Sequence, residues 1–108
     1  MIDLHIHSNY SDGTFSVFEI LEKAQSANVT AISITDHNTI EAYHEIKNRR
    51  SLYTGRIIKG VEINCLFDGS KIEILGYCFE DDAFLQEWLN AHFSPQHELE
   101  FRRREYAK

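Results

Sequence analysis

The sequence is poor in several features that would point to particular classes of protein. It has only two cysteines in 108 residues, Cys65 and Cys78, and their spacing excludes a zinc ribbon or a thioredoxin motif. No apolar run is long enough to cross a bilayer, and no basic-then-apolar leader opens the chain. Acidic residues outnumber basic ones, and the net charge of −6 argues against a general nucleic-acid or membrane surface. These absences predict a cytoplasmic protein with reduced cysteines.

Enough apolar residues are present for one small domain. They make up 43% of the chain, which is ordinary for a globular protein. Repeats, low-complexity segments and linkers are absent from the sequence. We therefore expect a single partial domain over residues 1–108, with its motifs in 1–78 and a helical tail over 81–108.

The pattern of apolar residues predicts alternating strands and helices. Ser16 and Glu19 form a capping box that opens the first helix, and Asn28 is a stop signal. Asp68-Gly69 is a hairpin turn. The expected strands are 2–6, 31–34, 56–67 and 71–78, and the expected helices start at residues 16, 40, 81 and 95. The order strand, helix, strand, helix, strand is typical of an α/β fold with a parallel sheet or barrel.

The first strand carries the most informative pattern. Ile2, Leu4 and Ile6 alternate with polar residues, so Asp3, His5 and His7 project from the opposite face. Two imidazoles held side by side on a strand can bind one divalent metal ion. Asp3 is expected to orient a histidine rather than to bind metal.

Further metal-binding side chains follow the next two strands. Asp36 and His37 come just after the second strand, and Glu62 lies within the third strand region. Parallel strands place their carboxyl ends on one rim, so these groups should meet His5 and His7 there, with Asp12 folding over from the first loop. Two alternatives stay open: Asp36 can cap the following helix, and Glu62 can be an exposed strand residue. His44, His92 and His97 are expected at the surface or at caps.

This set of side chains predicts a particular chemistry. Mixed imidazole and carboxylate ligands suit Zn²⁺, Mn²⁺ or Fe²⁺, and we expect one to three ions. Paired metals can activate a water and clamp a phosphoryl oxygen. Ser8, Ser11 and Asn38 are candidates for donating hydrogen bonds to substrate phosphate oxygens.

Taken in order, the motifs resemble the polymerase and histidinol phosphatase (PHP) domain family, in its branch of small bacterial metal-dependent phosphoesterases. The matching segments are Asp3-x-His5-x-His7-Ser8, Ser11-Asp12-Gly13, Ile34 to Thr39, Gly60-Val61-Glu62-Ile63 and Ile74-Leu75-Gly76-Tyr77. The resemblance implies the N-terminal portion of a distorted parallel β/α barrel, with a β-hairpin after the third strand and C-terminal helices. It implies His5, His7, Asp12, His37 and Glu62 as metal ligands, with Glu62 bridging, and a metal-activated hydroxide as the nucleophile.

One residue departs from the family pattern. Glu73 stands where that branch usually has a histidine. A two-residue turn at Asp68-Gly69 makes paired positions sum to an odd number, so Glu73 shares a face with Glu62 and Asn64. Glu73 then either binds metal through oxygen, which favours harder ions, or points to solvent.

The chain also ends before the family's later ligand motifs. A full barrel takes about 250 residues, and a shorter parallel sheet exposes an unpaired edge. Three explanations stay open: a fragment of a longer protein, a homo-oligomer that covers the edge, or a shortened homologue that binds metal poorly.

The residues therefore predict a metal-dependent phosphoesterase acting on a small phosphorylated substrate, such as a nucleotide or another phosphomonoester, with an incomplete site in this chain. Two other functions compete with it. One is an amidohydrolase-like metal hydrolase, which also begins with His-x-His on a first barrel strand. The other is a non-catalytic metal-binding or assembly fragment.

Overall fold

A computed structural model describes residues 1–93 of the chain. The secondary-structure elements in chain order are β1 (Ile2–Ile6), α1 (Val17–Ser26), β2 (Ala31–Ile34), α2 (Ala42–Arg49), a short 3₁₀ helix η1 (Arg50–Leu52), β3 (Arg56–Ile57), β4 (Gly60–Phe67), β5 (Ser70–Tyr77) and α3 (Asp82–His92). The expected helix opened by Pro95, with His97 near its start, lies outside the described residues.

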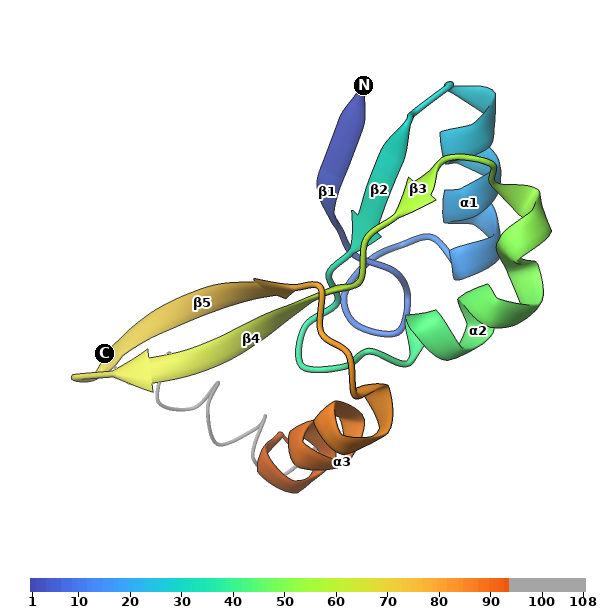
Figure 1. Ribbon diagram of the computed structural model, residues 1–108. Coiled ribbons are helices and arrows are strands. Elements are labelled where there is room, and N and C mark those ends of the chain that lie inside the picture. Colours follow the sequence, from blue (N-terminus) through green and yellow to red (C-terminus); the bar gives the residue numbers. More distant parts are fainter. Residues whose placement is uncertain (94–108) are drawn as a thin grey trace.

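The strands form two separate sheets (Figure 1). β1, β2 and β3 make a parallel sheet in that order, and α1 and α2 lie against one side of it. β4 and β5 make an antiparallel hairpin that projects away from the parallel sheet, with α3 beneath it. The α/β class and the parallel winding of the first three strands are confirmed.

The local signals at α1 and at the hairpin are confirmed. Ser16 caps α1 and forms the full capping box with Glu19. Asp68 and Gly69 both have positive φ, of 52° and 77°, which is the backbone of a two-residue type I′ turn. Glu73 pairs with Asn64 across the hairpin, as the odd register sum requires.

The prediction of one strand over 56–67 was wrong. The chain leaves the parallel sheet after Ile57, and β4 begins at Gly60 in the other sheet. A Cβ on Gly60 would lie 2.3 Å from Ser33 Oγ and 2.7 Å from Thr35 Cγ2, so glycine permits the close crossing over β2. The buried Tyr43 hydroxyl fixes the crossing, because it accepts hydrogen bonds from the Ile34 and Gly60 N–H groups at 3.1 and 2.8 Å.

The second helix also begins later than expected, at Ala42 rather than Ile40. Ile40 lies in the preceding loop, where its N–H donates to Gln86 Oε1 on α3 at 2.9 Å. That contact crosses 46 residues of sequence, which is why local periodicity did not show it. The loop thus ties the end of β2 to α3.

The core lies between the parallel sheet and α1 and α2. Its buried apolar side chains include Val17 and Leu21 from α1, Ile32 and Ile34 from β2, and Ile46 from α2. α3 adds Leu89, which is fully buried. Ile6 at the end of β1 packs against this core, and the ends of β1 and β2 lead into the site described below.

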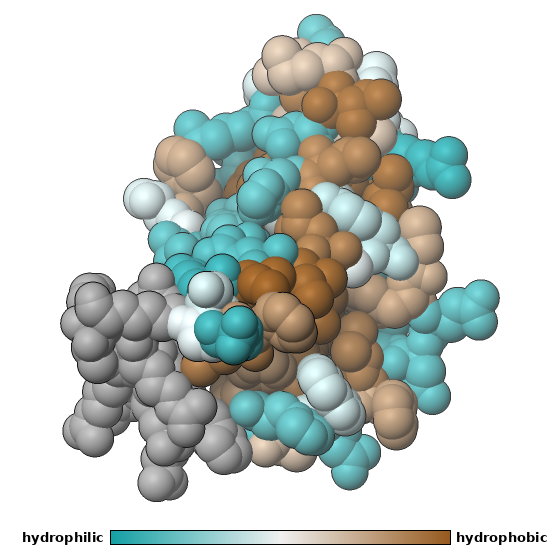
Figure 2. All heavy atoms as spheres, turned by 90° about the vertical axis from the view of Figure 1, so that its left-hand side faces the viewer, coloured by the Kyte–Doolittle hydropathy of each residue, from teal (hydrophilic) through white to brown (hydrophobic). Residues whose placement is uncertain are grey.

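The far edge of β1 has no paired strand among residues 1–93. Figure 2 shows apolar side chains gathered on the side of the molecule where β1 and the hairpin lie. Exposed apolar residues of these strands are Ile2, Leu4, Phe67, Ile72, Ile74, Leu75 and Tyr77. An open sheet edge was expected from the sequence, and the structure has one.

Candidate metal centre

His5 and His7 converge on the carboxylate of Glu62. Their Nε2 atoms lie 3.1 and 2.7 Å from Glu62 Oε1, and their ring centroids are 5.2 Å apart. The strand alternation of β1 explains this arrangement, because residues two apart project from the same face. The structure thus brings these two histidines together as expected.

Glu62 reaches the centre from the start of β4. It forms a parallel bridge with His37, and its N–H donates to the Asp36 carbonyl at 3.0 Å. Its side chain is only 3% exposed, so it is not the exposed strand residue that one alternative supposed. The segment after β2 therefore fixes where this carboxylate points.

The carboxyl of Glu62 is strongly acidic in this setting. Burial by itself raises its pKa, but neighbouring hydrogen bonds and the charge of His37 outweigh burial and lower the pKa from 4.5 to about 2. The hydrogen-bonding side chains are those of Glu73, His5 and His7. Glu62 is thus an anion over the whole physiological range.

Asp12 and His37 complete the cluster on the other side of His7. Asp12 Oδ1 lies 2.7 Å from His7 Nδ1, and Asp12 Oδ2 lies 3.2 Å from His37 Nε2. The His7 and His37 ring centroids are 4.4 Å apart. Burial raises the pKa of Asp12, yet the charge of His37 and the hydrogen bond from His7 lower it overall. The loop after β1 therefore folds over the rim, as predicted.

Asp36 anchors that loop from below. It is 1% exposed and accepts three hydrogen bonds: from Ser8 N at 2.6 Å, Ser8 Oγ at 2.7 Å and Ser11 Oγ at 2.7 Å. It does not cap α2, whose N-cap residue is Glu41. Sequence reasoning missed this role, because the partners of Asp36 lie 25 and 28 residues away.

Two asparagines orient His37 from behind. Asn64 Oδ1 lies 3.1 Å from His37 Nδ1, which turns Nε2 towards Asp12 and Glu62. Asn38, whose φ is 55°, accepts a hydrogen bond from the Asn64 N–H through Oδ1 at 3.0 Å. A hydrogen bond at one ring nitrogen, such as that between Asn64 and His37 Nδ1, fixes the ring orientation and tautomer of a histidine that binds metal through its other nitrogen.

Glu73 lies at the outer side of the cluster, on β5. One ligand atom from each of Glu73, Glu62 and His37 falls within a group whose atoms all lie within 4.8 Å of one another. Lys71 Nζ is 3.1 Å from Glu73 Oε1. The structure thus places Glu73 at the centre, on the same face as Glu62, although its side chain is 36% exposed.

The residues present fit divalent metal ions. Three overlapping groups have ligand atoms within 4.8 Å of one another: His5, His7 and Glu62; His7, Asp12 and His37; and His37, Glu62 and Glu73. Ligand atoms on neighbouring positions of an ion, each bonded at about 2.1 Å, lie about 3.0–3.4 Å apart. The Nε2 atoms of the three histidines lie 2.7–3.8 Å from Glu62 Oε1, so small shifts bring them to those distances. Both ring nitrogens of His7 face carboxylate oxygens at 2.7 Å, and a neutral imidazole has one N–H to donate. Both contacts are satisfied when His7 carries a proton on each nitrogen, or when a metal ion takes the place of one of those protons.

The predicted phosphate-binding residues lie beside the cluster but differ in exposure. Ser8 is fully buried, and its hydroxyl is engaged by Asp36 and by the Tyr10 N–H. Ser11 is partly buried; its hydroxyl donates to Asp36 Oδ1 at 2.7 Å, and Asp12 Oδ1 lies 3.5 Å away. This geometry favours a positioning role for Ser8 over direct contact with a substrate.

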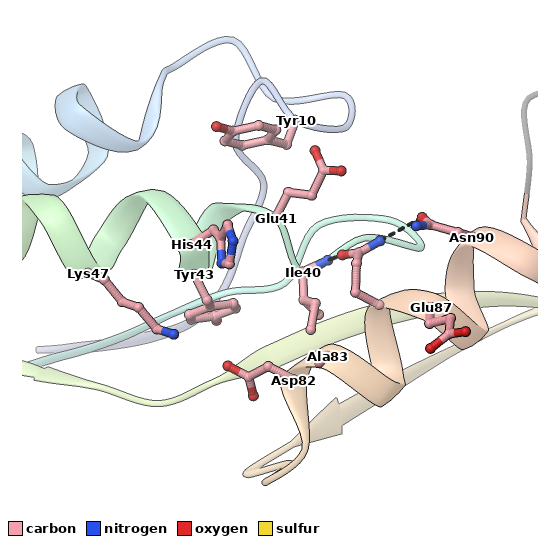
Figure 3. A pocket seen from close by; sticks show the side chains of 11 residues that line it. Tyr10, Ile40, Glu41, Tyr43, His44, Lys47, Asp82, Ala83, Glu87 and Asn90 are labelled. Carbon is pink, nitrogen blue, oxygen red and sulfur yellow. Dashed lines mark hydrogen bonds between the residues drawn. The ribbon is translucent and has the colours of Figure 1, made fainter.

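A separate pocket of about 560 Å³ lies between α2 and α3 (Figure 3). Its lining includes Tyr10, Tyr43, His44 and Asp82, and none of the cluster residues. Tyr10 connects this pocket with the metal-ligand cluster. It belongs to the loop that carries Asp12, and its hydroxyl donates to Glu45 Oε1 on α2 at 3.0 Å.

The other histidines and the cysteines do not join the cluster. His44 is exposed on α2, and His92 stacks on Trp88 near the end of α3, with ring centroids 4.4 Å apart. Cys65 and Cys78 are both free. Within residues 1–93, none of the helices is long and apolar enough to cross a membrane.

Comparison with known proteins identifies relatives of this chain. A 5'-3' exoribonuclease of Haemophilus influenzae is 35% identical over 78 residues, which cover 72% of this chain and 28% of that protein. A phosphoribosyl 1,2-cyclic phosphate 1,2-diphosphodiesterase of Eggerthella lenta is 33% identical over 86 residues, which cover 75% of this chain and 32% of the relative.

The fold is also found among solved structures. An amidohydrolase from Chromobacterium violaceum, solved with sulfate and without metal, superposes with a TM-score of 0.73 at 24% identity. The match covers 83% of this chain and 32% of that one. The chain thus spans about a third or less of the length of each of these proteins. The family model described as the PHP domain matches residues 3–106, and the chain belongs to the PHP domain family.

Proposed function

We propose that this chain supplies the metal-binding part of a PHP-type phosphoesterase, which hydrolyses a phosphate ester. The observation that carries the proposal is the convergence of three histidines on one buried, ionised carboxylate. The Nε2 atoms of His5, His7 and His37 lie 3.1, 2.7 and 3.8 Å from Glu62 Oε1. Burying a carboxylate costs free energy unless hydrogen bonds or a positive charge offset the loss of water. Imidazole and carboxylate groups placed together in this way are suited to binding metal cations.

The proposed metal ligands are His5, His7, Asp12, His37, Glu62 and Glu73, holding one to three Mn²⁺, Zn²⁺ or Fe²⁺ ions. Bound ions would activate a water and neutralise charge on the phosphoryl oxygens. Glu62 would be shared between ions, because its Oε1 is close to all three histidines. Its low pKa keeps it ionised and ready to bind a cation.

Other residues of the chain would hold this set in place. Asp36 fixes the loop that carries Asp12, and Asn64 fixes the ring of His37. Asn38 is proposed to donate to substrate phosphate oxygens. Ser8 and Ser11 are proposed to act through Asp36, to which both hydroxyls donate. The proposed substrate is a small phosphorylated compound, such as a nucleotide or another phosphomonoester. The two relatives are named as an exoribonuclease and as a cyclic phosphate diphosphodiesterase, which is why a phosphodiester is also assayed below.

The chain spans less than a third of these relatives, so further groups of the site would come from outside residues 1–108. A second copy of the chain, or the remainder of a longer one, would also cover the open edge of β1. One partial domain, a cytoplasmic location and this assembly all stay predictions.

The first test is metal binding by the chain and its His7→Ala variant. His7 contacts both Glu62 and Asp12, so we expect the variant to lose Mn²⁺ or Zn²⁺ affinity by about 10- to 100-fold or more. Elemental analysis and calorimetric titration after chelator treatment measure this directly. His92→Gln is the matched control, since His92 lies on α3 away from the cluster. Equal metal content in both variants would contradict the proposed centre.

The second test separates the competing functions. Protein loaded with Mn²⁺ is assayed on a phosphate monoester, a phosphodiester and an amide. Turnover of a phosphoester that His7→Ala abolishes supports the proposal. Turnover of the amide alone would support the amidohydrolase alternative, and metal binding without turnover would support a non-catalytic metal-binding fragment.

A further inference from the structure

One side of the proposed metal centre is richer in oxygen than the other. The group of His5, His7 and Glu62 offers two imidazole nitrogens and one carboxylate. The group of His37, Glu62 and Glu73 offers one imidazole and two carboxylates. Glu73 is the residue that supplies the additional oxygen donor, because it belongs to this group alone, whereas His37 and Glu62 each belong to another group as well.

The backbone aims Glu73 at the centre. The register of the hairpin pairs Glu73 with Asn64, and strand alternation puts both on the face of Glu62. Asn64 in turn contacts the ring of His37 at 3.1 Å. The Glu73 side chain is therefore next to the part of β4 that holds His37 in position.

The contact between Glu73 and Glu62 calls for a positive charge. One carboxylate oxygen of each residue lies in a group whose atoms are all within 4.8 Å of one another. Two carboxylates at this separation repel one another unless a cation or proton is shared between them. The ion pair with Lys71 at 3.1 Å compensates Glu73 from one side, but an exposed pair of this kind contributes little and does not block a metal.

We propose that Glu73 sets the metal preference of the centre, by making the position formed with His37 and Glu62 a site for a hard, oxygen-preferring ion. Carboxylate ligands suit Mn²⁺, whereas imidazole suits Zn²⁺. Glu73 therefore raises the affinity for Mn²⁺ relative to Zn²⁺. The inference rests on the proposed metal centre and adds a residue that determines which metal it takes.

The test compares three variants of the full 108-residue chain after removal of metal by a chelator. Glu73→Gln removes the charge at the site, and Glu73→His replaces an oxygen ligand by nitrogen. Asp68→Asn is the matched control, because it removes a carboxylate from the exposed turn of the same hairpin and asparagine tolerates its positive φ. Circular dichroism in the presence of chelator checks that all variants fold alike.

Mn²⁺ binding is followed by the electron paramagnetic resonance signal of the free ion, and Zn²⁺ binding by competition with a chromophoric chelator. We expect Glu73→Gln to weaken at least one Mn²⁺ by about tenfold or more. Glu73→His should lower the ratio of Mn²⁺ to Zn²⁺ affinity by about tenfold, while Asp68→Asn keeps the ratio of the parent chain.

The possible results separate the inference about Glu73 from the proposal of phosphoester hydrolysis. Equal Mn²⁺ affinity and stoichiometry in Glu73→Gln and Asp68→Asn, or an unchanged affinity ratio in Glu73→His, would overturn the inference while leaving phosphoester hydrolysis intact. The expected shifts in a protein that hydrolyses no phosphoester would uphold the inference and remove the catalytic proposal. A parent chain that binds neither ion would overturn both.

Discussion

At the scale of single residues, Asp36 shows how a buried charge can serve a site that it does not join. Its carboxylate takes three short hydrogen bonds from Ser8 and Ser11 and lies almost wholly out of solvent. The loop between β1 and α1 is thereby held at both serines, and Asp12 lies next to the second of them. Gly13 permits the tight return, since a Cβ there would lie 2.0 Å from the His7 carbonyl oxygen.

We predict that Asp36→Asn destabilises the chain by about 1–3 kcal/mol, because the amide nitrogen cannot accept the hydrogen bonds that one carboxylate oxygen accepts now. Urea denaturation in the presence of chelator measures the loss. The variant should also bind Mn²⁺ more weakly, since Asp12 loses its fixed position. Ser11→Ala removes one of the three bonds and should have a smaller effect; an effect as large as that of Asp36→Asn would count against this account.

At the scale of elements, a helix, strand or turn was predictable from the sequence when residues close to it in the chain determine it. The alternation along β1, the capping box of α1 and the turn at Asp68-Gly69 are each fixed by neighbours in sequence, and all three appear in the structure. The meeting of His5, His7, His37 and Glu62 was also predictable, because each of them lies near the end of a strand and these ends lie on the same side of the fold.

The missed features depend on contacts between distant residues. The chain breaks after Ile57 because Gly60 crosses β2 closely and because Tyr43, on α2, binds the backbone on both sides of the crossing. The sequence of residues 56–67 alone predicts one continuous strand. The late start of α2 likewise depends on Gln86 of α3, and the role of Asp36 on two serines far from it in sequence.

The crossing of β4 over β2 gives a prediction with a built-in control. Gly60→Ala would put a Cβ 2.3 Å from Ser33 Oγ and 2.7 Å from Thr35 Cγ2, so we expect a loss of about 1–3 kcal/mol. Gly76→Ala, on the neighbouring strand of the hairpin, meets only Val61 Cγ1 at 3.7 Å and should be close to neutral. Equal unfolding free energies of the two variants in urea would contradict the proposed reason for the break.

At the scale of the whole molecule, the centre joins parts that otherwise have little in common. β1 and the loop after it, the segment following β2, and both strands of the hairpin each contribute a residue. The hairpin forms its own sheet and projects from the parallel one (Figure 1). An ion bound by all three parts would therefore link the two sheets.

We predict that saturating Mn²⁺ stabilises the folded chain and that a chelator reverses the effect. At a free ion concentration about 100 times the dissociation constant, the gain is about 2.7 kcal/mol, or roughly 10–20 °C in Tm for a domain of this size. Thermal unfolding followed by circular dichroism measures it. For an affinity 10- to 100-fold lower, His7→Ala should gain only about 0.4–1.4 kcal/mol at the same ion concentration. A rise of the parent's size in that variant would mean that Mn²⁺ acts elsewhere.

The two-residue turn at Asp68-Gly69 has a consequence for how such a centre can change over evolutionary time. Because successive side chains of β5 point to opposite faces, adding or removing one residue at the turn would rotate Glu73 away from Glu62 and bring a neighbour, Ile72 or Ile74, into its place. A single codon gained or lost at the tip would thus exchange a charged ligand for a hydrocarbon, with no substitution anywhere in the cluster.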